Sequence, residues 1–159
     1  MFDYLKNILL GENKSPDKTS GENSSENLKL QIATCALFIE MANADSDFTE
    51  EERNKIISVM QNIFSTDKEA VEELIELSEN RIKKSISLYE FTSIVNEHFS
   101  NDEKFELLKN LWRLIYIDEK LDMYEDQLIK RIGGMLKIDH QVIIGAKLLV
   151  KEELKSGRD

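Results

Sequence analysis

The chain has 159 residues, 41% hydrophobic and 33% charged, a composition typical of one soluble globular domain. Its 31 acidic residues outnumber its 21 Lys and Arg residues, and the net charge of −10 argues against binding to nucleic acids or anionic lipid surfaces. Cations or basic proteins are the favoured partners. No apolar run reaches the roughly 18 residues of a membrane-spanning helix, so direct membrane insertion is not expected.

A single cysteine, Cys35, lies in the apolar stretch IATCALF and excludes an intrachain disulfide. The opening residues MFDYLKNILL have neither a basic leader nor a small-residue cleavage site, so they do not resemble a secretion signal. Both features favour a cytoplasmic protein. We expect Cys35 to be a small buried hydrophobic residue rather than a reactive thiol.

The chain divides into three segments by composition. Residues 1–10 predict an amphipathic helix, because Phe2, Leu5, Ile8 and Leu9 fall on one face. Residues 11–26 contain the only proline and no large apolar side chain, which predicts a flexible linker. Residues 27–155 carry the apolar periodicity and form the predicted folded domain.

Within that domain, helix-start signals recur in which a capping residue is followed three places later by Glu. The five pairs are Thr49 with Glu52, Thr66 with Glu69, Ser87 with Glu90, Ser100 with Glu103, and Asp122 with Glu125. Between these signals the apolar residues follow helical spacing, and strand signals are almost absent. The pattern predicts an all-α protein, a single compact bundle of about seven helices.

Two segments of this domain resemble each other at a constant offset of 73 residues. The first reads ADSDFTEEE and the second reads IDEKLDMYE, so that Asp45 matches Asp118 and Glu52 matches Glu125. In both segments an Asp at the end of one helix is followed by a Glu in the first turn of the next. We therefore predict an internal duplication, two related helical hairpins about a pseudo-two-fold axis.

The acidic turns of the two hairpins predict a possible cation site. Ca²⁺ and Mg²⁺ take several oxygen ligands, and these turns supply carboxylates that the tight connections bring near one another. The candidate ligands are Asp45, Asp47, Glu52, Asp118 and Glu125. An EF-hand is excluded, because a loop starting at Asp45 has Glu50 at position six and Ile56 at position twelve. The alternative interpretation is that the acidic residues only cap helices and complement the helix dipole.

Other chemistry has little support. The histidines, His98 and His140, lack a second ligand at metal-binding spacing, and no glycine-rich phosphate loop or nucleophile motif is present. Trp112 and Tyr116 lie one helical turn apart and are expected in the core, while Gly133 and Gly134 are expected to allow close helix packing or a local kink. No catalytic residue is predicted.

Three stretches carry a resemblance to a known family: CALFIEMANADSDFTEEE, SLYEFTSIVNEHFS and LLKNLWRLIYIDEKLDMYEDQLIKRIGGMLKI. They resemble the TerB (tellurite resistance protein B-like) family, in particular its short single-domain bacterial branch. The resemblance implies an all-helical cytoplasmic domain connected with tellurite resistance or stress. It also implies a binding module in larger, often membrane-associated assemblies, with motif positions at Asp45, Glu52, Asp118 and Glu125. The family usually has Gly after the motif Asp, where this chain has Ser46 and Glu119.

These observations predict a non-enzymatic TerB-like module that binds protein partners through acidic turns, with a Ca²⁺ or Mg²⁺ ion as the only candidate cofactor. One alternative is a hydrolase-type enzyme that uses the carboxylates and a metal as Lewis acid. The other is a plain adaptor whose acidic residues are caps alone.

Overall fold

The computed structural model describes residues 19–45, 48–85, 87–118 and 123–156, except for the side chains of 19–24, 45 and 118. These residues form seven α-helices and two short 3-10 helices, without a strand, which confirms the all-α prediction. In chain order they are α2 (Thr19–Ala42), η1 (Asn43–Asp45), α3 (Glu50–Phe64), α4 (Lys68–Lys84), α5 (Tyr89–His98), α6 (Asn101–Ile115), η2 (Tyr116–Asp118), α7 (Met123–Met135) and α8 (His140–Ser156).

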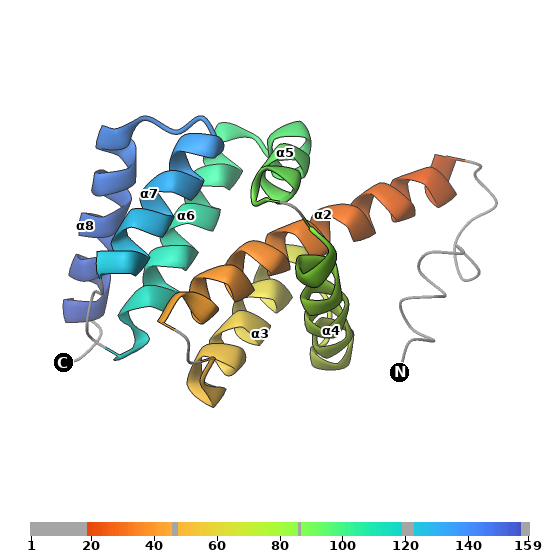
Figure 1. Ribbon diagram of the computed structural model, residues 1–159, viewed down its shortest axis with the longest axis horizontal. Coiled ribbons are helices and arrows are strands. Elements are labelled where there is room, and N and C mark those ends of the chain that lie inside the picture. Colours follow the sequence, from red (N-terminus) through yellow and green to blue (C-terminus); the bar gives the residue numbers. More distant parts are fainter. Residues whose placement is uncertain (1–18, 46–47, 86, 119–122, 157–159) are drawn as a thin grey trace.

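Helix α2 is the centre of the bundle and contacts α3, α4, α5, α6 and α7 (Figure 1). Its C-terminal half is therefore buried on nearly all sides: Cys35, Phe38 and Ile39 are fully inaccessible or almost so. A helix surrounded by neighbours needs apolar residues around its whole circumference, and IATCALFIEMA supplies them.

The start of α2 corrects a predicted boundary. The helix begins at Thr19, so residues 19–26 of the predicted linker are helical. Extending a helix adds one backbone hydrogen bond per residue, so a helix anchored by Leu28 and Leu30 continues outward into polar sequence. The predicted helix at residues 1–10 lies outside the described residues.

Helices α6, α7 and α8 lie side by side on one flank of the bundle (Figure 1). Trp112 of α6 is fully buried there, stacks on Tyr116 with ring centroids 6.1 Å apart, and donates from Nε1 to the carbonyl of Ile143 in α8 over 3.2 Å. The predicted core role of Trp112 is confirmed. Gly133 lies directly against Ile143, so the predicted close approach of helices at this glycine is also confirmed.

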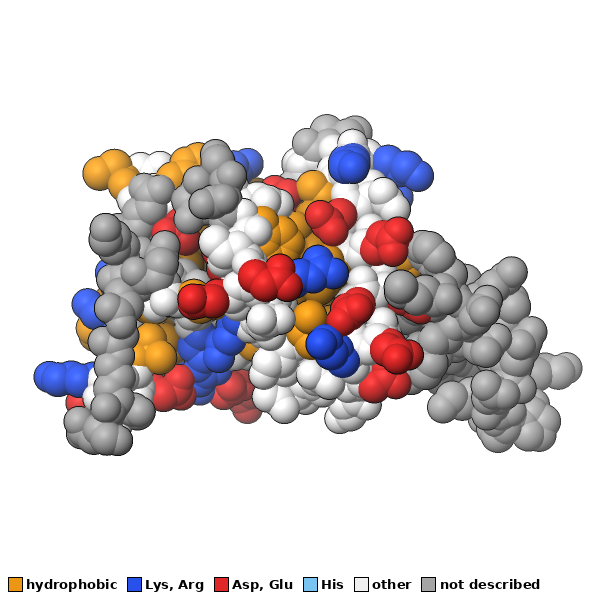
Figure 2. All heavy atoms as spheres, turned by 90° about the horizontal axis from the view of Figure 1, so that it is seen from below, with side chains coloured by type: hydrophobic (Ala, Val, Ile, Leu, Met, Phe, Trp, Pro, Cys, Tyr) orange, Lys and Arg blue, Asp and Glu red, His pale blue; other side chains and the backbone are white. Residues whose placement is uncertain are grey.

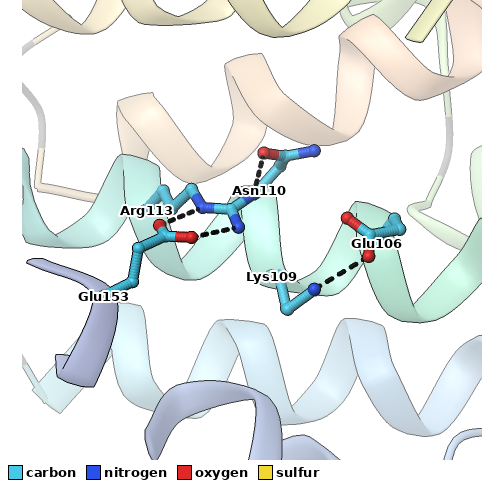
Figure 3. Close-up of polar contacts among 5 residues, drawn as sticks. All are labelled: Glu106, Lys109, Asn110, Arg113 and Glu153. Carbon is cyan, nitrogen blue, oxygen red and sulfur yellow. Dashed lines mark hydrogen bonds and ion pairs between the residues drawn. The ribbon is translucent and has the colours of Figure 1, made fainter. Parts of the chain in front are cut away.

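The same flank is tied together by an ion pair on its surface. Arg113 of α6 donates from Nε and an Nη atom to both carboxylate oxygens of Glu153 in α8, over 2.7 and 2.8 Å, and to Oδ1 of Asn110 over 2.6 Å (Figure 3). The ion pair raises the pKa of Arg113, mainly through the hydrogen bond to Glu153, and lowers that of Glu153.

The helix caps agree with the predictions in part. The capping boxes at Thr49 and Ser100 are present in full. Helix α4 is capped by Asp67, one residue after the predicted Thr66, because the carboxylate of Asp67 accepts from the backbone N–H of Ala70. Helix α5 has no side-chain cap, and its Glu90, predicted to complete a box, pairs with Arg81 instead. Among the described residues no helix is long and apolar enough to cross a bilayer.

Candidate functional site

Two acidic helix–helix corners form the candidate site. The first corner, residues 43–52, joins α2 to α3 through η1, and the second corner, residues 116–125, joins α6 to α7 through η2. The end of the first helix, the 3-10 turn and the start of the next helix are each displaced by 73 residues between the corners. The elements thus recur in the order and spacing that the sequence repeat predicts, while the pseudo-two-fold relation itself stays a prediction.

Glu52 is the buried acid of the first corner, and only 7% of its surface is exposed. It is the third residue of α3, and its Oε1 accepts from the backbone N–H of Thr49 over 2.9 Å and from Oγ1 of Thr49 over 3.0 Å. Oγ1 of Thr49 accepts in turn from the backbone N–H of Glu52 over 3.1 Å. Capping therefore explains the position of this carboxylate, which lies at the positive end of α3.

Glu125 is the corresponding acid of the second corner. It is the third residue of α7 and only 3% exposed. Few carboxylates are buried in this protein, and two of the three buried ones occupy the matching positions of the two corners, among the described residues. A buried carboxylate is retained only where polar partners or a cation compensate for its lost hydration.

The two corners adjoin each other. Helix η1 of the first corner contacts α7, which begins within the second corner. Asn43 and Ala44 of the first corner line the same surface cleft as Tyr124 of the second corner. The backbones of Asp45 and Asp118 lie in the two 3-10 turns, but their side chains, and all of Asp47, lie outside the described residues.

The shared cleft has a volume of about 580 Å³ and is lined by residues of α2, η1 and α7 together with Ser87 and Leu88, which directly precede α5. Its charged residues are Glu40 of α2 and Arg131 of α7. Partial burial removes water from the Glu40 carboxyl and raises its pKa. Tyr124 is 58% exposed at the edge of the cleft. Neither Glu52 nor Glu125 is among the lining residues, so the cleft lies beside the buried carboxylates and does not contain them.

Sequence reasoning missed Glu40, Tyr124 and Arg131. Each reads as an ordinary surface residue. Tyr124 and Arg131 lie two turns apart on α7, and the packing of α7 against η1 brings them to one cleft with Glu40 of α2. The one signal in the sequence was an aromatic residue, Tyr124, directly before the motif residue Glu125.

The described part of the site does not by itself form a metal centre. Among the described residues no group of three or more His, Cys, Asp or Glu side chains is arranged to hold a metal ion. Glu52 and Glu125 supply two carboxylates, fewer than the six to eight oxygens typical of Ca²⁺. The other candidate ligands, Asp45, Asp47 and Asp118, belong to the side chains that the structure does not describe.

Cys35 does not offer a nucleophile. It is fully buried, and desolvation raises the pKa of its thiol from 9.0 to about 12. The prediction of a buried hydrophobic role is confirmed. His98 ends α5 with its Nδ1 2.9 Å from the carbonyl oxygen of Ile94 and its Nε2 3.3 Å from a carboxylate oxygen of Glu26.

The fold and the site define the protein as a small all-α module with two acidic corners. The family model described as "Tellurite resistance protein TerB" matches residues 31–148, and the chain belongs to this family. The match includes both corners and the cleft between them. Comparisons with curated proteins and with solved structures gave no match.

Proposed function

We propose that this protein is a non-enzymatic TerB-family binding module that works in the bacterial cytoplasm in a response to tellurite or a related stress. Its two acidic corners are the functional site. The observation that carries the proposal is the meeting of the corners, where Asn43 and Ala44 share a cleft with Tyr124. Family membership supports the proposal in its general form.

In this proposal the corners hold one divalent cation, Ca²⁺ or Mg²⁺. Glu52 and Glu125 contribute carboxylates from the first turns of α3 and α7, where they are buried and positioned. Asp45, Asp47 and Asp118 complete the oxygen ligands. The ion neutralises part of the negative charge and fixes the two corners relative to each other.

The partner is a protein with a basic surface, either alone or in a membrane-associated assembly. The net charge of −10 makes the surface predominantly acidic, and Figure 2 shows acidic side chains interspersed with basic ones on one face. Such a surface speeds association with cationic partners and repels nucleic acid.

The test is thermal melting during titration with CaCl₂ and with MgCl₂. Binding to the native state alone stabilises it by about 2.7 kcal/mol when the free ion is at 100 times its Kd, so the melting temperature should rise with concentration. The variant D45N/D118N should lose the rise. The matched control E69Q/E76Q removes two carboxylates from exposed positions of α4 and should keep it.

Two results would contradict the cation site. An unchanged melting temperature of the wild type with both ions would leave the corner acids as helix caps and the protein as a plain adaptor. An equal rise in D45N/D118N and wild type would place the ion elsewhere. If the D45N/D118N variant still captures a basic partner, partner binding does not depend on the cation.

A further inference from the structure

A second surface, distinct from the acidic corners, is a groove between α2 and α5. It has a volume of about 710 Å³ and also borders the last turns of α4. Helix α5 runs antiparallel to α2, because His98 at its end pairs with Glu26 whereas Leu88 at its start lies in the same cleft as Glu40. The apolar residues lining the groove are Ile32, Ala33, Tyr89, Phe91 and Ile94.

This groove exposes apolar surface to solvent. Tyr89 is 66% exposed, the largest value among the aromatic side chains that the structure describes, and Ile32 and Ile94 are only partly buried. Figure 1 shows that the first turns of α2 extend past α4 and α5, so no described helix covers this end of the groove. Partly exposed apolar side chains that line a groove can receive the apolar face of another segment.

The rim carries charges of both signs that largely pair among themselves. Glu26 lies 3.7 Å from Lys29 and 3.3 Å from His98, and Arg81 pairs with Glu90. A rim of mixed charge selects neither a strongly basic nor a strongly acidic ligand. It suits an amphipathic helix with an apolar face and few charges.

Residues 1–10 have this chemistry. The segment places four large apolar side chains on one helical face, and its only charged side chains are Asp3 and Lys6. From Phe2 to Leu9 it covers seven helical steps, about 10 Å, which equals the span from Glu26 to Ala33 along the groove.

The connecting residues also have the required reach. Eight residues, 11–18, separate the segment from the start of α2 and span up to roughly 27 Å when extended. From Thr19 to Lys29, near the middle of the groove, α2 covers about 15 Å. The connection can therefore turn back, and it orients the segment antiparallel to α2, with Leu9 toward Glu26.

We propose that residues 1–10 form an amphipathic helix that occupies the groove between α2 and α5 of the same chain. The groove is thus a helix-binding site filled in cis, and a partner helix of similar chemistry has to displace the segment to enter it.

The test uses cysteine labelling of the full chain. Ser93→Cys places a nearly isosteric thiol in the groove, and Ser58→Cys places one on the exposed face of α3 as a reference. The native thiol, Cys35, is fully buried and does not compete for reagent. Docking predicts alkylation at position 93 about tenfold slower than in a chain whose segment cannot dock.

Docking is removed by Leu5→Asp on the apolar face, and the matched control Asn7→Asp adds the same charge on the opposite face. Leu5→Asp should accelerate labelling at position 93 and leave position 58 unchanged, whereas Asn7→Asp should change neither rate. Equal rates at position 93 in all three backgrounds would overturn the proposal. Protection that appears only at high protein concentration would also overturn it, because the segment would then come from a second copy.

Discussion

A Cβ atom added to Gly133 in α7 would stand 2.5 Å from Cδ1 and 2.8 Å from Cγ1 of Ile143 in α8. The two helices therefore approach each other as closely as they do because this position has no side chain. A Cβ atom added to the neighbouring Gly134 would have nothing packed against it within 4 Å, so this glycine faces open space. The pair provides an internal comparison between a glycine that packing requires and one that it does not.

We expect Gly133→Ala to lower the free energy of unfolding by about 1–2 kcal/mol, since overpacking costs more than the gain in helix propensity. Gly134→Ala should raise it by about 0.5–1 kcal/mol. Urea denaturation of the two variants measures both values. Equal effects of the same sign would show that α8 shifts freely to accommodate the methyl group.

The ion pair between Arg113 and Glu153 predicts a pH-dependent contribution to stability. Arg113 lowers the pKa of Glu153 below its ordinary value of 4.5, so the contribution is present above that value and is lost as the pH falls through the lowered one. Because Glu153 is half exposed, Glu153→Gln should cost no more than about 1 kcal/mol at pH 7. Denaturation should show that Glu153→Gln has a lower free energy of unfolding than wild type at pH 7 and that this difference disappears in acid. The control Glu152→Gln should have little effect at either pH.

Cys35 should react only after the protein unfolds. Its thiol is buried and its pKa is raised from 9.0 to about 12, so at pH 8 almost no thiolate is present in the native state. Iodoacetamide labelling should therefore follow the population of unfolded chains as urea is added. The raised pKa also predicts that the contribution of the neutral thiol to the free energy of unfolding is fully present below pH 9 and is lost as the pH rises from 9 toward 12. Fast labelling without denaturant would contradict this.

Glu40 predicts the opposite behaviour to Glu153. Desolvation raises its pKa, so at pH 7 the charged form is less favourable in the folded protein than in the unfolded chain. Glu40→Gln should raise the free energy of unfolding at pH 7 by a few tenths of a kcal/mol, since the group is only partly buried. The gain should vanish as the pH falls below 4.5. A loss of stability at pH 7 would instead show that the carboxylate makes a favourable contact in the cleft.

The helices of this protein were predictable because local signals and burial agree. Thr49 and Ser100 begin capping boxes in the sequence and in the structure, and the apolar spacing around Trp112 matches its burial. Predictions failed where another residue, either on a different helix or at the next position of the chain, took over the predicted contact. Glu90 pairs with Arg81 of another helix, and Asp67 supplies a better cap than Thr66.

The candidate site was predictable only in its motif residues. The repeat identified Glu52 and Glu125, which are the buried acids of the two corners. The cleft beside them combines Glu40 of α2 with Tyr124 and Arg131 of α7, and no spacing along the chain encodes the packing of η1 on α7 that brings the two helices together there.

The reliance of α8 on α6 and α7 has a consequence for how the protein opens. The central helix α2 holds α3, α4 and α5 to α6 and α7, while the last helix docks mainly on α6 and α7 through the Trp112 and Gly133 contacts to Ile143. An element attached on one side detaches at a lower free energy than one enclosed by its neighbours. We therefore expect the amide hydrogens of α8 to exchange before those in the enclosed C-terminal half of α2, and the six helices that remain still contain both acidic corners.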